Sequence, residues 1–183
     1  MQRRQTQVLM FLAAMTVAVA ANAQTTVTLP DSSQTTTLDA NVSEQAHVTV
    51  PATVSFAVND VTASTAASAA TITVNSIVLA TATKQLRISL QAAAPAFTPP
   101  VVGATTWSAS DVSWNAATWT GSTSGAAAGT LSDTAFGAVV ICDGDVSICS
   151  TSGLIFSLAA KTTIRRSGLH ALTVNWKLEA IGT

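Results

Sequence analysis

The chain has few residues that could carry out acid–base or nucleophilic chemistry. Its 183 residues include two histidines, His47 and His170, and neither lies near a Gly-x-Ser-x-Gly motif that would expose a nucleophilic serine. Glycosidases need two opposed carboxylates, but the nine acidic residues are dispersed along the chain, and only Glu44 and Glu179 are glutamates. This pattern predicts no catalytic residues and a protein that is not an enzyme.

The one acidic cluster is Asp143-Gly144-Asp145. A calcium loop of the EF-hand type places oxygen ligands at alternate positions and ends in a bidentate glutamate, whereas this cluster stops after two acids. Aspartates in such a position commonly accept backbone hydrogen bonds within a turn. We therefore expect neither a metal ion nor another cofactor.

The first 23 residues have the three parts of a secretory signal peptide. Arg3 and Arg4 precede a largely apolar run, Val8–Ala21, and small residues then form a cleavage site after Ala23. The run is shorter than the about 20 residues of a membrane span, and no second run of that length follows. We expect cleavage after Ala23, no membrane partner after cleavage, and a protein that a bacterium secretes to its periplasm or cell surface.

Cys142 and Cys149 are the only cysteines, with six residues between them. Disulfides persist in oxidising compartments, so export predicts a disulfide between the two. A redox-active pair would need a setting that stabilises a thiolate, such as Cys-x-x-Cys, which this spacing lacks. Because Asp143-Gly144 favours a tight turn, we expect the disulfide to pin a surface hairpin.

Period-two alternation of apolar and polar residues predicts strands and gives no sign of a long helix. The clearest alternation covers Val48–Val58, Leu86–Leu90, Leu154–Leu158 and Leu172–Ala180. Pro51 cannot donate a backbone hydrogen bond, so the first of these is expected to be two strands or one strand bent at a sheet edge. A change of phase at Asn75-Ser76 predicts a β-bulge.

Seven to nine such strands, separated by turn signals, predict an all-β fold: an antiparallel, immunoglobulin-like β-sandwich, with a β-barrel as the alternative. The expected organisation is a signal peptide at 1–23, an N-terminal tail or edge strand at 24–40 and a single domain at 41–183. The inward-facing apolar residues define the expected core, which comprises Val48, Val50, Val54, Phe56, Ile72, Val74, Leu86, Ile88, Leu90, Phe136, Leu154, Phe156, Leu172, Val174, Trp176 and Leu178.

Three tryptophans, Trp107, Trp114 and Trp119, fall within the least regular stretch of the chain, Val101–Gly129. On an exposed face they would form a platform on which the sugar rings of a polysaccharide stack. Buried, they would fill the space between sheets, as large rings commonly do. We expect the buried arrangement and keep the exposed platform as the alternative.

The tail at 24–40 contains one short alternating piece. Val27 and Leu29 alternate with threonines, and Pro30-Asp31 separates them from the domain. A strand this short gains little by itself, but it gains backbone partners if it pairs with an open sheet edge. The edge could belong to its own domain or to a neighbouring copy by β-augmentation, and the third possibility is a disordered tail.

The composition narrows the class of function. Only 9% of the residues are charged, and bases do not outnumber acids, so we expect no nucleic-acid partner. The exported all-β layout, the short disulfide and the terminal Gly168-Leu-His-Ala-Leu-Thr-Val-Asn-Trp strand resemble small secreted bacterial proteins of the fimbrial-subunit type. The chain lacks the N-terminal cysteine pair and the tyrosine near the C-terminus of subunits that use a periplasmic chaperone, so the resemblance covers architecture alone.

That resemblance implies a non-catalytic structural subunit of a pilus-like, matrix or surface-coat assembly, whose partners are copies of itself or other surface proteins. The alternative is a secreted carbohydrate- or surface-binding module that uses its tryptophans. Filaments of the purified protein would favour the first interpretation, and a monomer with exposed tryptophans that binds polysaccharide would favour the second.

Overall fold

The computed structural model describes residues 28–30, 32, 34–122 and 126–182. The chain divides into two units, one ending at Ala40 and the other beginning at Asn41. The described residues of the first unit form no helix or strand. The predicted signal peptide and Val27 lie outside the described residues.

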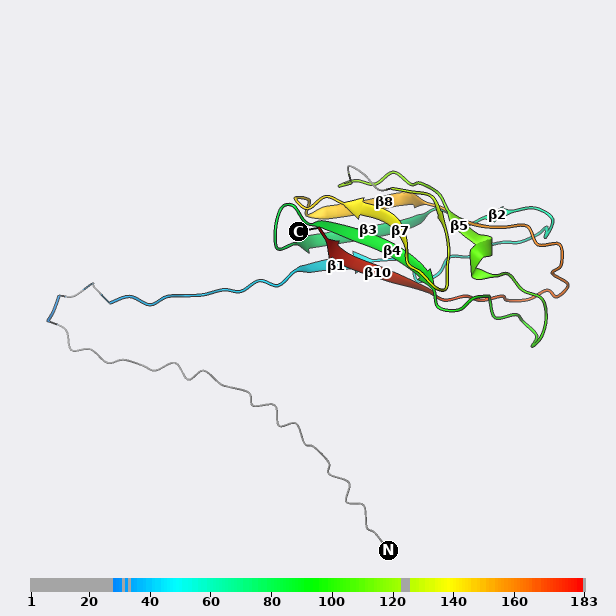
Figure 1. The fold of residues 1–183 in the computed structure, drawn as a ribbon, viewed down its shortest axis with the longest axis horizontal. Coiled ribbons are helices and arrows are strands. Elements are labelled where there is room, and N and C mark those ends of the chain that lie inside the picture. Colours follow the sequence, from blue (N-terminus) through cyan, green and yellow to red (C-terminus); the bar gives the residue numbers. More distant parts are fainter. Residues whose placement is uncertain (1–27, 31, 33, 123–125, 183) are drawn as a thin grey trace, which may run out of the picture. The chain divides into compact units, whose positions relative to one another are not determined.

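The second unit is all-β, as the alternation predicts (Figure 1). The described residues include no α-helix and one short 3₁₀ helix, η1 (Ala109–Asp111). The ten strands are β1 (Gln45–Thr49), β2 (Thr65–Ala66), β3 (Ala70–Val78), β4 (Gln85–Ala92), β5 (Val112–Trp114), β6 (Gly129–Thr130), β7 (Gly137–Cys142), β8 (Ile148–Leu154), β9 (Phe156–Leu158) and β10 (Val174–Ile181).

The strands form three antiparallel sheets with the orders β1-β3-β8, β10-β4-β7 and β2-β9-β5-β6. The sheets do not close into a barrel, so the arrangement is that of a sandwich. Only Ile155 separates β8 from β9, so one nearly continuous stretch of chain passes from the first sheet into the third.

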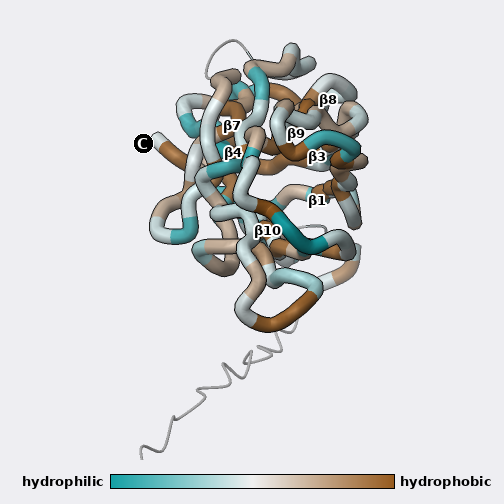
Figure 2. The backbone as a smooth tube through the Cα atoms, turned by 90° about the vertical axis from the view of Figure 1, so that its right-hand side faces the viewer, coloured by the Kyte–Doolittle hydropathy of each residue, from teal (hydrophilic) through white to brown (hydrophobic). Residues whose placement is uncertain are grey.

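The central strand β4 shows how the sequence directs the packing. It pairs with β10 along its whole length, from Gln85 opposite Ile181 to Ala92 opposite Val174, and with β7 on its other side. Leu86, Ile88 and Leu90 are almost completely buried, as their alternation predicts. Brown interior segments of the tube in Figure 2 follow this apolar core.

The predicted bulge in β3 is also present. Gln45 lies opposite Val78, whereas His47 lies opposite Asn75, so β3 has one more residue than β1 over this interval. Ser76 takes up the extra length with a φ of 51°, a conformation that is uncommon outside glycine and typical of bulges and turns.

The predicted disulfide joins Cys142 to Cys149. The expected surface hairpin is wrong, because Cys142 ends β7, Cys149 belongs to β8, and these strands lie in different sheets. Both cysteines are completely buried. The disulfide therefore ties the two sheets together along one side of the sandwich.

Several predicted core residues on or next to the edge strands are exposed or only half-buried. Val48 and Phe136 are 44% and 41% exposed, and the Phe136 ring lies beneath the Lys177 ammonium, 5.5 Å from its centroid. Strand β1 ends at Thr49, and Val50, Val54 and Phe56 continue in an extended segment that has no strand partner among the described residues. Pro51 explains the end of the strand because it has no N–H to donate.

Candidate functional site

The side of the sandwich opposite the disulfide is open. Strand β1 is the outermost strand of the first sheet, and β10 is the outermost strand of the second. Both views place β1 and β10 near one another (Figures 1 and 2), yet no ladder joins these two strands within the described residues. The two sheets are thus linked at β7 and β8 and present free edges on the other side.

A groove of about 980 Å³ lies along this open side, at the upper end of the range typical of ligand sites. One lip is the extended segment 51–58, and the other is the segment 164–174 that leads into β10. Six buried apolar residues line the floor: Phe97, Trp107, Val112, Leu131, Phe156 and Leu158.

The lips carry apolar side chains that the fold covers only in part. Most of the half-buried apolar residues that pack on the core belong to the lips or to the chain next to them. They are Ala46, Val50, Val54, Phe56, Val58, Val61, Leu172, Val174, Trp176 and Leu178. Ile77 and Val146 are the two exceptions. The core therefore lacks a covering layer at this side, although the alternation along each lip is that of a strand with one buried face.

One stretch of each lip also lacks hydrogen bonds to other backbone groups. No hydrogen bond between backbone groups joins residues 52–58 to another described residue, and the same holds for 165–170, where the Arg166 carbonyl lies 3.3 Å from His170 Nε2. Further along the second lip, Ala171 and Thr173 bond to Thr98 and Ala93, and β10 bonds to β4. The groove thus lies between two extended edges with backbone donors and acceptors available for another strand.

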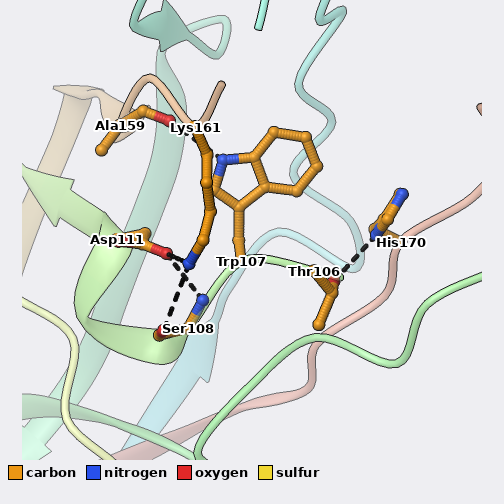
Figure 3. Close-up of polar contacts among 7 residues, drawn as sticks. All are labelled: Thr106, Trp107, Ser108, Asp111, Ala159, Lys161 and His170. Carbon is orange, nitrogen blue, oxygen red and sulfur yellow. Dashed lines mark hydrogen bonds and ion pairs between the residues drawn. The ribbon is translucent and has the colours of Figure 1, made fainter. Parts of the chain in front are cut away.

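Trp107 is the largest side chain of the floor, and a polar network fixes its position (Figure 3). Its indole N–H donates to the Ala159 carbonyl at 2.9 Å. The His170 ring packs edge-on against the indole, with centroids 5.1 Å apart, and His170 Nδ1 lies 2.8 Å from the Thr106 hydroxyl. The floor of the groove is therefore held in place before anything binds.

An ion pair between Lys161 and Asp111 lies on the other side of Trp107. Lys161 Nζ lies 2.7 Å from Asp111 Oδ2, which also accepts the Ser108 backbone N–H at 2.7 Å. Burial raises the pKa of the Asp111 carboxyl, but the hydrogen bonds from Lys161 and Ser108 outweigh this effect and bring the pKa below its ordinary value. The pair joins η1 to the chain after β9 and so supports the wall of the groove.

Within the described residues, neither histidine lies against an acidic side chain that could orient it as a general base. Asp111 bonds to Lys161 and Ser108 rather than to His170, and His47 is an exposed residue of β1. No group of three histidine, cysteine, aspartate or glutamate side chains in the described part of the chain is placed to hold a metal ion. The described helical residues form no helix long and apolar enough to cross a membrane.

The three tryptophans are buried, with 5%, 4% and 7% of Trp107, Trp114 and Trp119 exposed. The alternative of an exposed stacking platform is therefore wrong, and the rings are core residues. Of these three, Trp107 reaches the groove, as part of its floor, and the half-buried Trp176 of β10 lines the groove as well.

Sequence reasoning missed the groove itself. A signal was present in Pro51, which interrupts hydrogen bonding while the apolar alternation on either side continues, and in the irregular chain at 165–168, which precedes the alternation that begins at Leu172. Of the predicted strand-exchange residues, Leu29 is 82% exposed, and Val27 lies outside the described residues.

Comparison of the chain with protein-family models, with curated proteins and with solved structures finds no match.

Proposed function

We propose that the protein is a non-catalytic structural subunit of an extracellular assembly, such as a pilus-like fibre, a matrix or a surface coat. The observation that carries this proposal is the groove, which combines two unpaired backbone edges with half-buried apolar lips over a preformed floor. An extended strand from another molecule would complete both sheets at once and cover the exposed part of the core.

The tail at 24–40 is the segment of this chain that suits the groove. Its alternating Val27 and Leu29 would place two apolar side chains on one face, toward the floor, while the neighbouring threonines face solvent. Each subunit has both a groove and a tail, so a tail that enters the groove of the next copy makes a head-to-tail contact. Such contacts build open filaments when the rotation between subunits does not close a ring.

The disulfide supports an extracellular place of action, because such bonds persist in oxidising compartments. We propose that the signal peptide directs the chain to the periplasm or cell surface of a bacterium and that the mature protein begins at Gln24. The intact mass of the exported protein should match residues 24–183, and a mass that includes Arg3 and Arg4 would contradict export by cleavage.

The test compares assembly of the mature protein with that of two tail variants, by electron microscopy and light scattering. Val27→Asp with Leu29→Asp places charge on the apolar face of the tail, and Thr26→Ala with Thr28→Ala alters the opposite face as a matched control. We expect filaments from the mature protein and from the control, but monomers with an unchanged melting temperature from the aspartate variant.

A mature protein that remains monomeric at every concentration would overturn the structural-subunit proposal. Filaments that persist in the aspartate variant would show that another contact drives assembly. A monomeric variant with a lowered melting temperature would instead assign the tail to the sheet of its own domain.

A further inference from the structure

Two loops meet at the end of the domain that faces the viewer in Figure 2. Thr98 and Ala171 exchange two backbone hydrogen bonds, of 2.8 and 3.1 Å. Gly168 packs so closely on Pro100 that an added Cβ would lie 2.8 Å from the proline Cβ. The loops 98–104 and 165–171 therefore form one unit, which we name the apolar tip.

The apolar tip presents aliphatic side chains to solvent. Val101, Val102 and Leu169 are 57%, 100% and 80% exposed. The Ala104 N–H donates to the Val101 carbonyl at 3.1 Å, and Gly103 has a φ of 78°, the pattern of a type II turn with glycine at its third position. This turn, preceded by Pro99-Pro100, holds the valines outward at little conformational cost.

The charged residues of the two segments that form the apolar tip have one sign. The stretches 93–110 and 162–176 contain no acidic residue, whereas Arg165 and Arg166 are both present and exposed. The next acid along the chain, Asp111, is already bonded to Lys161. In a protein with more acids than bases, the two loops of the tip carry only positive charge, and the exposed Asp60 lies beside Val61, which lines the same groove as the arginines.

We infer that the apolar tip binds the surface of an anionic phospholipid bilayer. Valine and leucine side chains gain by moving from water into the acyl boundary, while the flanking arginines meet the lipid phosphates. A sugar ligand is disfavoured because the exposed side chains are aliphatic and offer no ring for stacking. The contact is peripheral and involves no membrane span; it departs from the sequence-based expectation of no membrane partner, which considered only spanning segments. Arg165, Arg166 and Leu169 also belong to the second lip of the groove, whereas Val101 and Val102 lie outside its lining. The valines therefore separate membrane binding from the proposed assembly.

Sedimentation of the mature protein with phosphatidylcholine vesicles, with and without phosphatidylglycerol, tests this inference. We expect binding to the anionic vesicles that weakens with salt. Val101→Ser with Val102→Ser should reduce partitioning at least about tenfold, whereas Val42→Ser, at another exposed valine, should leave it unchanged. Arg165→Gln with Arg166→Gln should reduce it about fivefold for each arginine removed, and lysine at both positions should preserve it.

Failure of the mature protein to bind anionic vesicles would overturn the inference, as would equal losses in the Val42→Ser control. Binding of inorganic phosphate that needs the arginines but not the valines would identify a free-anion site instead. Loss of self-association, rather than of vesicle binding, in the valine variant would assign the tip to a contact between copies. The Val27→Asp, Leu29→Asp variant should bind vesicles normally, so failure of the proposed assembly and failure of this inference give different results.

Discussion

Asp111 contributes to stability through its charge. Its pKa is lowered in the folded protein, so the folded state favours the ionised form, and the stabilisation is complete above the unfolded-state pKa of about 3.9. It is lost as the pH falls through the lower, folded-state pKa. About a quarter of each side chain of the Lys161–Asp111 pair is exposed, so solvent screens the pair only in part.

We expect Asp111→Asn to cost about 1–2 kcal/mol at neutral pH, because a charge-assisted hydrogen bond is lost. The difference from the parent protein should begin to shrink near the unfolded-state pKa of about 3.9 and disappear only below the lower folded-state pKa, where Asp111 is neutral in both states. Thermal unfolding from pH 7 to pH 2 measures this effect. In protein that also carries Lys161→Met, the loss of stability caused by Asp111→Asn should depend much less on pH. A loss that stays constant with pH in the parent protein would show that Asp111 does not stabilise the fold through its charge.

Gly129 provides the space for the Trp114 ring. A Cβ at Gly129 would lie 2.3 Å from the ring atom Cζ2, and the indole N–H on the same ring donates to Ala127. We expect Gly129→Ala to destabilise the domain by about 1–3 kcal/mol through overpacking. Gly153→Ala is the control, because its Cβ would meet nothing closer than 3.8 Å; denaturant unfolding should show a change near zero or a small gain there. Equal effects of the two changes would contradict this packing.

At the scale of elements, the disulfide acts as a cross-link between sheets rather than within a hairpin. Replacing both cysteines with alanine should cost about 2–3 kcal/mol in the entropic model, equivalent to several degrees in melting temperature. Alanine is preferable to serine because Cys142 and Cys149 are completely buried, and a buried hydroxyl would add a cost of its own. If the native protein's thiols react freely with an alkylating reagent, the cross-link is absent.

Alternation predicted the strands that lie between two neighbours. Strand β4 is paired on both sides, so its apolar face is buried as the period of two indicates. For Val48 and Phe136 the same pattern was misleading, because alternation identifies a face but does not show whether another layer covers it. The change of phase at Ser76 was informative, since an extra residue in a strand must reverse the faces.

The candidate site could be predicted only in fragments. The sequence showed the tail with Leu29 as an isolated alternating piece. The groove, however, depends on which strands lie at the edges of the sheets, and local periodicity does not determine the order of strands in a sheet. The tryptophans show the same limit, because their spacing in the sequence does not determine whether the rings are buried or exposed. The position of the disulfide between sheets likewise required knowledge of which strands pair.

At the scale of the whole molecule, a disulfide links the two sheets on one side of the sandwich, and the edge strands β1 and β10 are not joined on the other side. A segment that fills the groove binds the folded state and not the unfolded chain, so its binding must raise stability. The proposed donor is short enough to be supplied as a free peptide. This makes completion of the fold measurable without forming filaments.

We expect a peptide of residues 24–32 to raise the melting temperature of protein that lacks residues 24–31. The gain should increase with peptide concentration, reaching about 2.7 kcal/mol at one hundred times the dissociation constant. A peptide with aspartate in place of Val27 and Leu29 is the control and should give no shift. Phe56→Asp, which places a charge on a half-buried lip, should abolish the response to the native peptide. Equal shifts with both peptides, or a full response in the Phe56 variant, would place the binding outside the groove.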